Sequence, residues 1–247
     1  MRLRDKVAFV TGAGGGIGQA VCQRFLAEGA RIAATDIDPT AAAAAIAGSD
    51  AGRAIAIACD AGSSEDVRAA ISQAVTEFGQ LNVLCGIAGG SSTADGGVTD
   101  APEEEFWRVI RTDLFGSFLI CKYGIPELIK SGGGSVITMT SMTAMIGTTG
   151  RDCYSAAKGG VVAMTRSIAT GYGQYGIRVN AIAPGMTRTP RVMSRPSTPA
   201  RKALEARHLL GLVEPQDIAE MAVYLGSDES RVVTGQVLRV DSGATIH

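Results

Sequence analysis

The chain has 247 residues, of which 46% are hydrophobic and 19% are charged, and its formal net charge is −1. These values are typical of a globular protein with an apolar core, and they argue against disorder and against a nucleic-acid partner. No apolar run approaches the ~18 residues of a membrane span, so we predict a cytoplasmic protein without a membrane partner.

Short apolar runs alternate with longer helical stretches along the whole chain. Strands are predicted at 7–10, 31–35, 53–58, 83–87, 136–139, 179–182 and 237–240. Helices are predicted at about 16–28, after Pro39, and at 63–78, 103–130 and 152–175. This alternation predicts βαβ units. We therefore expect an α/β fold, a single-domain doubly wound Rossmann fold over residues 1–247, with a parallel sheet flanked by helices on both faces.

The cysteines are five in number, widely spaced, and show no Cys-x-x-Cys or Cys/His pattern. An odd number without such spacing predicts buried free thiols in a reducing compartment and no metal site.

A glycine-rich segment follows the first predicted strand and opens the first predicted helix. Its glycines would let the backbone approach a pyrophosphate, and the helix N-terminus would supply N–H groups and partial positive charge. The spacing is Gly-x-x-x-Gly-x-Gly, not the common Gly-x-Gly-x-x-Gly, and such a segment can also be a plain tight turn. Its place in the first βαβ unit favours a dinucleotide site. The predicted contacts are Gly12, Gly14, Gly15, Gly16, Ile17 and Gly18.

Asp36 lies 18 residues beyond Gly18, at the end of the second predicted strand. A carboxylate there can accept hydrogen bonds from an adenosine ribose and would repel a 2′-phosphate. No Arg or Lys lies in the glycine segment or directly after Asp36. Although Asp36 alone could be a solvated strand-end residue, beside the glycine segment it predicts NAD rather than NADP as the cofactor.

Tyr154 and Lys158 are four residues apart, so they share one face of the predicted helix. Tyrosine has an ordinary pKa of about 10, and a nearby ammonium favours its phenolate form, which can exchange a proton with an alcohol. Ser141 follows the strand at 136–139, where its hydroxyl could hold a substrate oxygen. Tyr-x-x-x-Lys alone is often a surface pair; Ser141 upstream favours a catalytic site.

These motifs occur in the order and spacing of the short-chain dehydrogenase/reductase family, which the sequence resembles over essentially its whole length. Asp60 in Cys-Asp-Ala and the segment Asn-Ala-Ile-Ala-Pro-Gly at 180–185 add to the resemblance. The resemblance implies that Tyr154 is the acid/base, that Ser141 meets the substrate oxygen, and that Lys158 meets the nicotinamide ribose. It also implies a homotetramer. The cofactor contacts that it implies are Ile37, Asp60 (to adenine), Ala61, Ala88, Gly89, Tyr154, Lys158, Pro184, Gly185, Thr187 and Thr189 (to the carboxamide).

Two positions depart from the family pattern. Gly86 stands where the family usually has an asparagine that is mainly structural, so we expect altered bracing of the loop. Asp113 stands where the family has an asparagine that positions a water in a proton relay to the lysine. We count Asp113 among the catalytic residues and expect it to retain the relay. A buried carboxylate at this place would favour charged Lys158 and could shift the pH optimum.

Between Met186 and Leu210 there are six basic residues and one acidic residue, a formal +5 in a chain whose total is −1. In the family this region, about 186–211 here, covers the substrate. Arginine binds carboxylates and phosphates through two parallel hydrogen bonds, so we predict an anionic small-molecule substrate held by Arg151, Arg191 and Arg195. The alternative is a solvated basic loop. His208 is predicted to lie on the surface of this loop.

We therefore predict an NAD-dependent oxidoreductase that interconverts a secondary alcohol and a ketone. The first alternative is a 3-oxoacyl-thioester reductase acting on an acyl carrier protein, although Asp36 disfavours the NADP that such enzymes often use. The second is a dinucleotide-sensing or scaffold protein without catalysis, which the presence of Ser141, Tyr154 and Lys158 disfavours.

Overall fold

The computed structural model describes residues 1–246, which contain one parallel sheet in the order β3-β2-β1-β4-β5-β6-β7. The predicted strands are confirmed, with ends that differ from the predicted ones by at most two residues. The strands are β1 (Val7–Thr11), β2 (Arg31–Asp36), β3 (Ala54–Ala58), β4 (Val83–Gly86), β5 (Gly134–Met139), β6 (Ile177–Pro184) and β7 (Val237–Val240).

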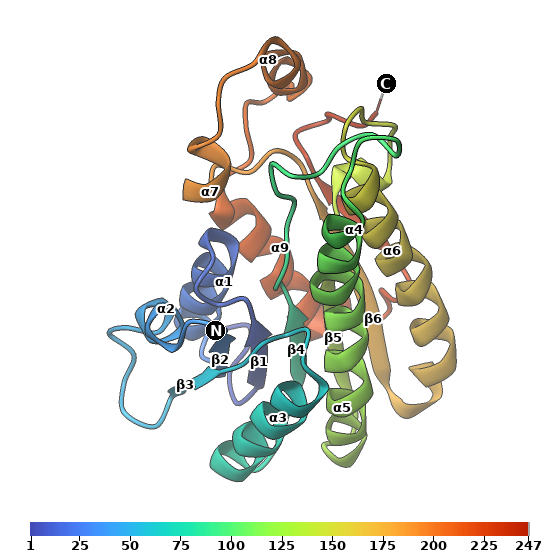
Figure 1. Ribbon diagram of the computed structural model, residues 1–247. Coiled ribbons are helices and arrows are strands. Elements are labelled where there is room, and N and C mark those ends of the chain that lie inside the picture. Colours follow the sequence, from blue (N-terminus) through green and yellow to red (C-terminus); the bar gives the residue numbers. More distant parts are fainter. Residues whose placement is uncertain (247) are drawn as a thin grey trace.

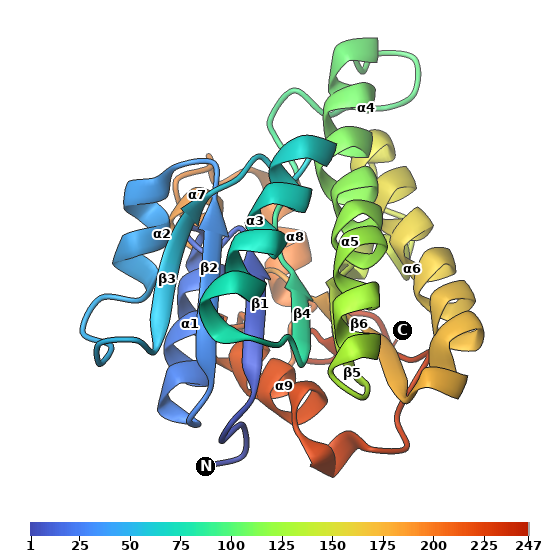
Figure 2. The same ribbon diagram turned by 90° about the horizontal axis from the view of Figure 1, so that it is seen from below.

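Helices cover both faces of the sheet, which explains why the strands are continuous apolar runs. In β1, Ala8 and Val10 belong to one buried cluster, whereas Val7 and Phe9 belong to the other. The first face carries α1 (Gly16–Ala27), α2 (Pro39–Ala45) and α9 (Pro215–Gly226), and the second carries α3 (Ser64–Phe78), α5 (Gly116–Lys130) and α6 (Asp152–Tyr172) (Figures 1 and 2). The predicted doubly wound α/β fold is confirmed.

The helix predicted at 103–130 is continuous but not uniform. It consists of α4 (Glu103–Val109), a π-helical turn over Ile110–Phe115, and α5. Such turns occur mostly as single insertions within α-helices, frequently at functional sites. Here the turn contains Asp113, whose side chain is fully buried.

The segment at 186–211, for which the sequence analysis predicts no helix, contains two short helices, α7 (Pro190–Met193) and α8 (Pro199–Ala206). Each begins with a threonine whose hydroxyl accepts a backbone hydrogen bond, followed directly by proline. This is a favourable helix start. In Figure 1 the two helices stand at the end of the molecule that also holds the loop after β4. We call residues 186–211 the lid segment.

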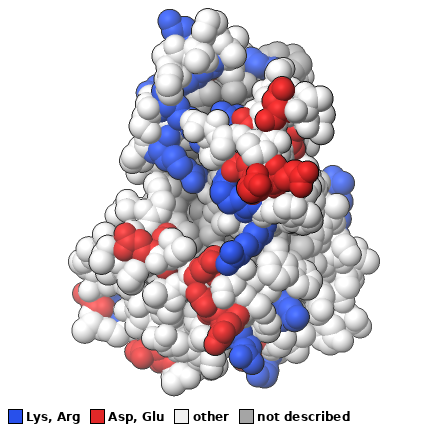
Figure 3. Space-filling model, in the orientation of Figure 1, with Lys and Arg blue, Asp and Glu red and all other residues white. Residues whose placement is uncertain are grey.

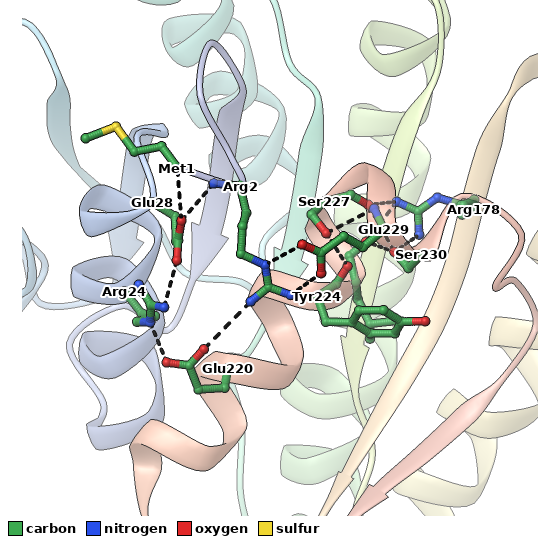
Figure 4. Close-up of polar contacts among 11 residues, drawn as sticks. Met1, Arg2, Arg24, Glu28, Arg178, Glu220, Tyr224, Ser227, Glu229 and Ser230 are labelled. Carbon is green, nitrogen blue, oxygen red and sulfur yellow. Dashed lines mark hydrogen bonds and ion pairs between the residues drawn. The ribbon is translucent and has the colours of Figure 1, made fainter.

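An ion-pair network joins the N-terminal residues to α1 and α9 (Figure 4). Arg24 pairs with both Glu28 and Glu220, and Arg2 pairs with Glu229 and donates its backbone N–H to Glu28. Because most of these side chains are partly exposed, solvent screens the pairs and each contributes little to stability.

The five cysteines are unpaired and buried, as predicted. Burial raises the pKa of Cys22 to about 12 and that of Cys59 to about 11, so their thiols are inert at neutral pH. Over the described residues, no helix is both long enough and apolar enough to cross a membrane.

Candidate active site

A cleft of about 1220 Å³ opens at the carboxyl edge of the sheet, beside β1 and β4, where the strand order reverses. Ligands bind at such a point in open parallel sheets. The volume exceeds the roughly 300–1,000 Å³ of one small-molecule site, so the cleft has room for a dinucleotide and a second molecule. The predicted site residues that line it are Gly12, Gly14, Gly15, Gly16, Ile17, Gly18, Asp36, Ile37, Asp60, Ala61, Ala88, Gly89, Ser141, Arg151, Tyr154, Lys158, Pro184, Gly185, Thr187, Thr189, Arg191 and Arg195.

The glycine segment forms one end of the cleft. A Cβ atom at Gly18 would lie 2.0 Å from the carbonyl oxygen of Gly12, so only glycine fits there. Helix α1 begins without a side-chain cap, which leaves its first N–H groups available to a diphosphate. The carboxylate of Asp36 accepts hydrogen bonds from the backbone N–H groups of Gly14 (2.9 Å) and Asp38 (3.1 Å). The residues at this end therefore fit a dinucleotide.

Ser141, Tyr154 and Lys158 meet in the same cleft because α6 is fixed to the end of β5. Ser141 follows β5, and Lys158 Nζ lies 5.5 Å from the ring centroid of Tyr154. Helix and strand are joined by Thr140, whose hydroxyl donates to the carbonyl oxygen of Lys158 at 2.8 Å. Lys158 Nζ donates in turn to the carbonyl oxygen of Met139 at 2.8 Å.

Asp113 does not line the cleft but lies directly beneath Lys158. Its Oδ1 is 2.9 Å from Lys158 Nζ, and both side chains are buried. Burial disfavours the ammonium, yet the charges of Asp113 and Tyr154 outweigh it and raise the pKa of Lys158 above its usual value. Oδ1 also accepts from the N–H of Gly90 at 2.8 Å, whereas Oδ2 is buried without a hydrogen-bond partner among the described residues.

The loop after β4 is held by Thr11. Its hydroxyl oxygen accepts hydrogen bonds from the backbone N–H groups of Ile87 (3.2 Å) and Ala88 (3.3 Å). This side chain braces the loop that follows Gly86, where the family's usual asparagine is absent.

Known proteins match this chain over nearly its whole length. A family model described as Enoyl-(Acyl carrier protein) reductase matches residues 12–245. The chain is 37% identical to the cis-4-hydroxycyclohexanecarboxylate dehydrogenase of Sinomonas cyclohexanicum, over 98% of this chain and 97% of that protein. It is 32% identical to the 3-oxoacyl-[acyl-carrier-protein] reductase of Thermotoga maritima over 100% of both proteins. A crystal structure of a short-chain dehydrogenase/reductase from Burkholderia xenovorans matches with a TM-score of 0.92 and 31% identity, over 100% of this chain and 98% of that chain.

This chain belongs to the short-chain dehydrogenase/reductase family. The resemblance seen in the sequence is thereby confirmed. The enzymes of this family are oxidoreductases that act on alcohols and ketones with a nicotinamide dinucleotide, and this chain is such an oxidoreductase.

His208 of this short-chain dehydrogenase/reductase is not on the loop surface, and that prediction is wrong. Its side chain is buried, Nε2 accepts from the N–H of Met186 at 2.9 Å, and Nδ1 lies 3.0 Å from the carbonyl oxygen of Leu204. The imidazole therefore ties the start of the lid segment to α8. The sequence places His208 in the predicted loop and carries no signal of this contact.

Asp95 was missed by the sequence analysis although it lines the cleft. Its carboxylate accepts from the backbone N–H groups of Cys153 (3.2 Å) and Tyr154 (3.1 Å). Arg151, at the N-cap of α6, provides no side-chain cap, so Asp95 satisfies the free N–H groups of that helix from a distant loop. The contact fixes the backbone of Tyr154 itself.

We expect Asp95→Ala to lower the unfolding free energy by about 1 kcal/mol, the usual effect of losing a helix cap. It should also lower kcat more than it weakens NADH binding, because Tyr154 loses its backbone anchor. Denaturant unfolding and steady-state kinetics measure the two effects. Asp100→Ala, which removes an exposed carboxylate from the same connection, is the control. An unchanged kcat in Asp95→Ala would contradict the anchoring role.

Proposed function

We propose that this short-chain dehydrogenase/reductase interconverts a secondary alcohol and a ketone with NAD, using Ser141, Tyr154, Lys158 and Asp113 as its catalytic residues. The observation that carries the proposal is the buried Lys158 ammonium held beside the Tyr154 ring, in a cleft that also contains Ser141.

In alcohol oxidation, Tyr154 as phenolate takes the hydroxyl proton, and the fixed ammonium of Lys158 favours that phenolate. The Ser141 hydroxyl donates a hydrogen bond to the substrate oxygen and orients it toward Tyr154. Bound NAD would accept the hydride from the carbinol carbon. In ketone reduction, Tyr154 returns its proton to the same oxygen.

The preference for NAD rests on Asp36. Its carboxylate is anchored by Gly14 and Asp38 at the adenosine end of the cleft. A fixed negative charge there suits a ribose 2′-hydroxyl and repels a 2′-phosphate.

An anionic substrate is supported by the arginines of the cleft. Arg151, Arg191 and Arg195 line it, and none of them is ion-paired with a carboxylate within residues 1–246. In Figure 3, which has the orientation of Figure 1, basic side chains gather on the upper part of the molecule near α7 and α8. The relative from Sinomonas cyclohexanicum is named for a hydroxy acid. We propose a hydroxy acid of this kind as the substrate class.

A second candidate is the reduction of 3-oxoacyl thioesters on an acyl carrier protein. It is favoured by the Thermotoga maritima relative and by the basic lid segment, which could meet an acidic carrier. Asp36 disfavours it wherever such a reductase uses NADP. A protein without catalysis remains the alternative of another class, and the shared cleft of Ser141, Tyr154 and Lys158 speaks against it.

We also propose a homotetramer in the cytoplasm. Phe115 and Phe118 stack on each other at 6.0 Å, and both are partly exposed along with Trp107, which leaves an apolar strip on the α4–α5 helix for another subunit. Five buried free thiols suit a reducing compartment.

The proposed reaction is tested with Tyr154→Phe, NAD, and a matched pair of alcohols, cis-4-hydroxycyclohexanecarboxylate and cyclohexanol. We expect the wild type to reduce NAD with the hydroxy acid in preference, and Tyr154→Phe to lose about 10²–10⁴-fold in kcat with NADH binding retained. Tyr172→Phe, a partly exposed tyrosine at the end of the same helix, is the control. Turnover by Tyr154→Phe at the wild-type rate would refute the assigned mechanism.

The cofactor preference is tested by fluorescence titration with NADH and NADPH. We expect the wild type to bind NADH more tightly, and Asp36→Ala to narrow the difference because the charge that repels the 2′-phosphate is gone. Asp38→Ala removes a neighbouring carboxylate and should leave the preference in place. Tighter binding of NADPH by the wild type would overturn the role of Asp36.

For Asp113 we expect Asp113→Asn to move the pH profile of kcat/KM for alcohol oxidation to lower pH. The charged groups acting on Lys158 are Asp113, Tyr154 and Arg191. Without the negative charge of Asp113, the Lys158 ammonium acts more strongly on Tyr154. The phenolate form of Tyr154 is then favoured at lower pH. Loss of the Asp113 charge also lowers the pKa of Lys158, so activity falls earlier at high pH. Identical profiles would remove Asp113 from the catalytic residues, and Asp100→Asn serves as the charge-matched control.

A further inference from the structure

Successive backbone carbonyls in the loop after β4 each accept a hydrogen bond from a different arginine. The arginines come from the lid segment, from α4 and from the start of α6, so they converge on one loop from three directions. The carbonyls and their donors are Gly89 with Arg191 (2.9 Å), Gly90 with Arg108 (3.3 Å), Ser91 with Arg195, and Ser92 with Arg151.

Arg151 and Arg195 are the two members of this set whose side chains are half-buried, whereas Arg108 and Arg191 are exposed. Arg151 precedes Tyr154 by three residues, and the charge of Tyr154 acts on Arg195. Both arginines are half-buried and line the cleft. Burial, followed by the charges of Arg151 and Arg191, lowers the pKa of Arg195. Neither arginine forms an ion pair with a carboxylate in the described chain, although the Glu105 carboxylate acts on Arg151 at longer range. A bound anion would relieve the repulsion between these like charges.

The loop carbonyls fix the two guanidinium groups but use few of their donors. A guanidinium has five N–H groups in a rigid fork. Within residues 1–246, Arg195 uses two of its nitrogens, on the carbonyl oxygen and the hydroxyl of Ser91, and Arg151 uses one, on Ser92. The free edges of two oriented forks match the two oxygens of a carboxylate.

We propose that Arg151 and Arg195 form a carboxylate subsite that holds the acid group of the substrate while Tyr154 acts on its hydroxyl. This subsite rests on the proposed function, and it assigns the recognition of the substrate's acid group to Arg151 and Arg195. A monoanion is favoured over a phosphate dianion because the carboxylate of Asp95 lines the same cleft and would repel a dianion more strongly. Since Arg195 belongs to the lid segment and Arg151 to α6, a bound carboxylate also joins the lid to the catalytic helix.

The subsite is tested by binding, with probes that cannot react. Calorimetry of the protein saturated with NADH measures the Kd of cyclohexanecarboxylate, of the neutral cyclohexanecarboxamide and of inorganic phosphate. We expect the carboxylate to bind best, and Arg151→Gln and Arg195→Gln each to weaken it by about tenfold or more, the usual effect of losing a charge-assisted hydrogen bond. Arg188→Gln removes the same charge from the lid segment outside the cleft and should leave the Kd unchanged.

Three outcomes overturn the subsite: no preference for the carboxylate over the carboxamide, unchanged affinity in both cleft variants, or an equal loss in Arg188→Gln, which would show a diffuse charge effect. Tighter binding of phosphate with the same loss in the variants would make the ligand a phosphate instead. NADH titration and oxidation of cyclohexanol by the same proteins separate this from the proposed function. If NADH binding and cyclohexanol oxidation persist while the protein binds the carboxylate no more tightly than the carboxamide, only the subsite is wrong. If no alcohol is oxidised, the proposed function is wrong whatever binds to the arginines.

Discussion

The constraint on which the site depends is the burial of the Lys158 ammonium. A cation with a 3% exposed side chain must have partners, and the protein supplies the carboxylate of Asp113 and the carbonyl oxygen of Met139. The first comes from the π-helical turn and the second from the end of β5. The position of Lys158, and with it that of Tyr154 one turn earlier, therefore depends on a strand, a helix and the turn between α4 and α5 all being in place.

The same ion pair links the two halves of the cleft. Asp113 Oδ1 also holds the N–H of Gly90, whose carbonyl belongs to the loop on which the arginines converge. The N–H of Gly90 thus meets Asp113, the partner of the catalytic lysine, whereas the carbonyl oxygens of the loop meet the arginines. One short segment with the sequence Gly-Gly-Ser-Ser separates the dinucleotide end of the cleft from the basic end.

Much of this could be read from the sequence, and the reason is local chemistry. Strands covered on both faces, such as β1, are continuous apolar runs, and Gly12 and Gly18 are required by the close approach of the backbone that the motif encodes. The features that were missed depend on contacts between distant segments. Asp95 caps α6 from 58 residues away, and the buried His208 contacts Met186, which lies 22 residues earlier in the chain. The helices of the lid segment do carry a local signal, because each begins with threonine followed by proline.

The π-helical turn also has a consequence for how α4 and α5 pack. Val109, at the end of α4, packs with Cys153 and Ala157 of α6, whereas Leu119 and Ile125 of α5 pack in the larger cluster beneath α3. An uninterrupted α-helix advances about 100° per residue, so one residue more or less rotates everything beyond it by that angle. The π-helical turn changes the rotation of α5 relative to α4 about their common axis. One continuous helix can then direct the apolar side chains of α4 and those of α5 toward two separate cores. Deletion of one residue between 110 and 115 would restore regular α-helical geometry and leave one of those stripes facing water.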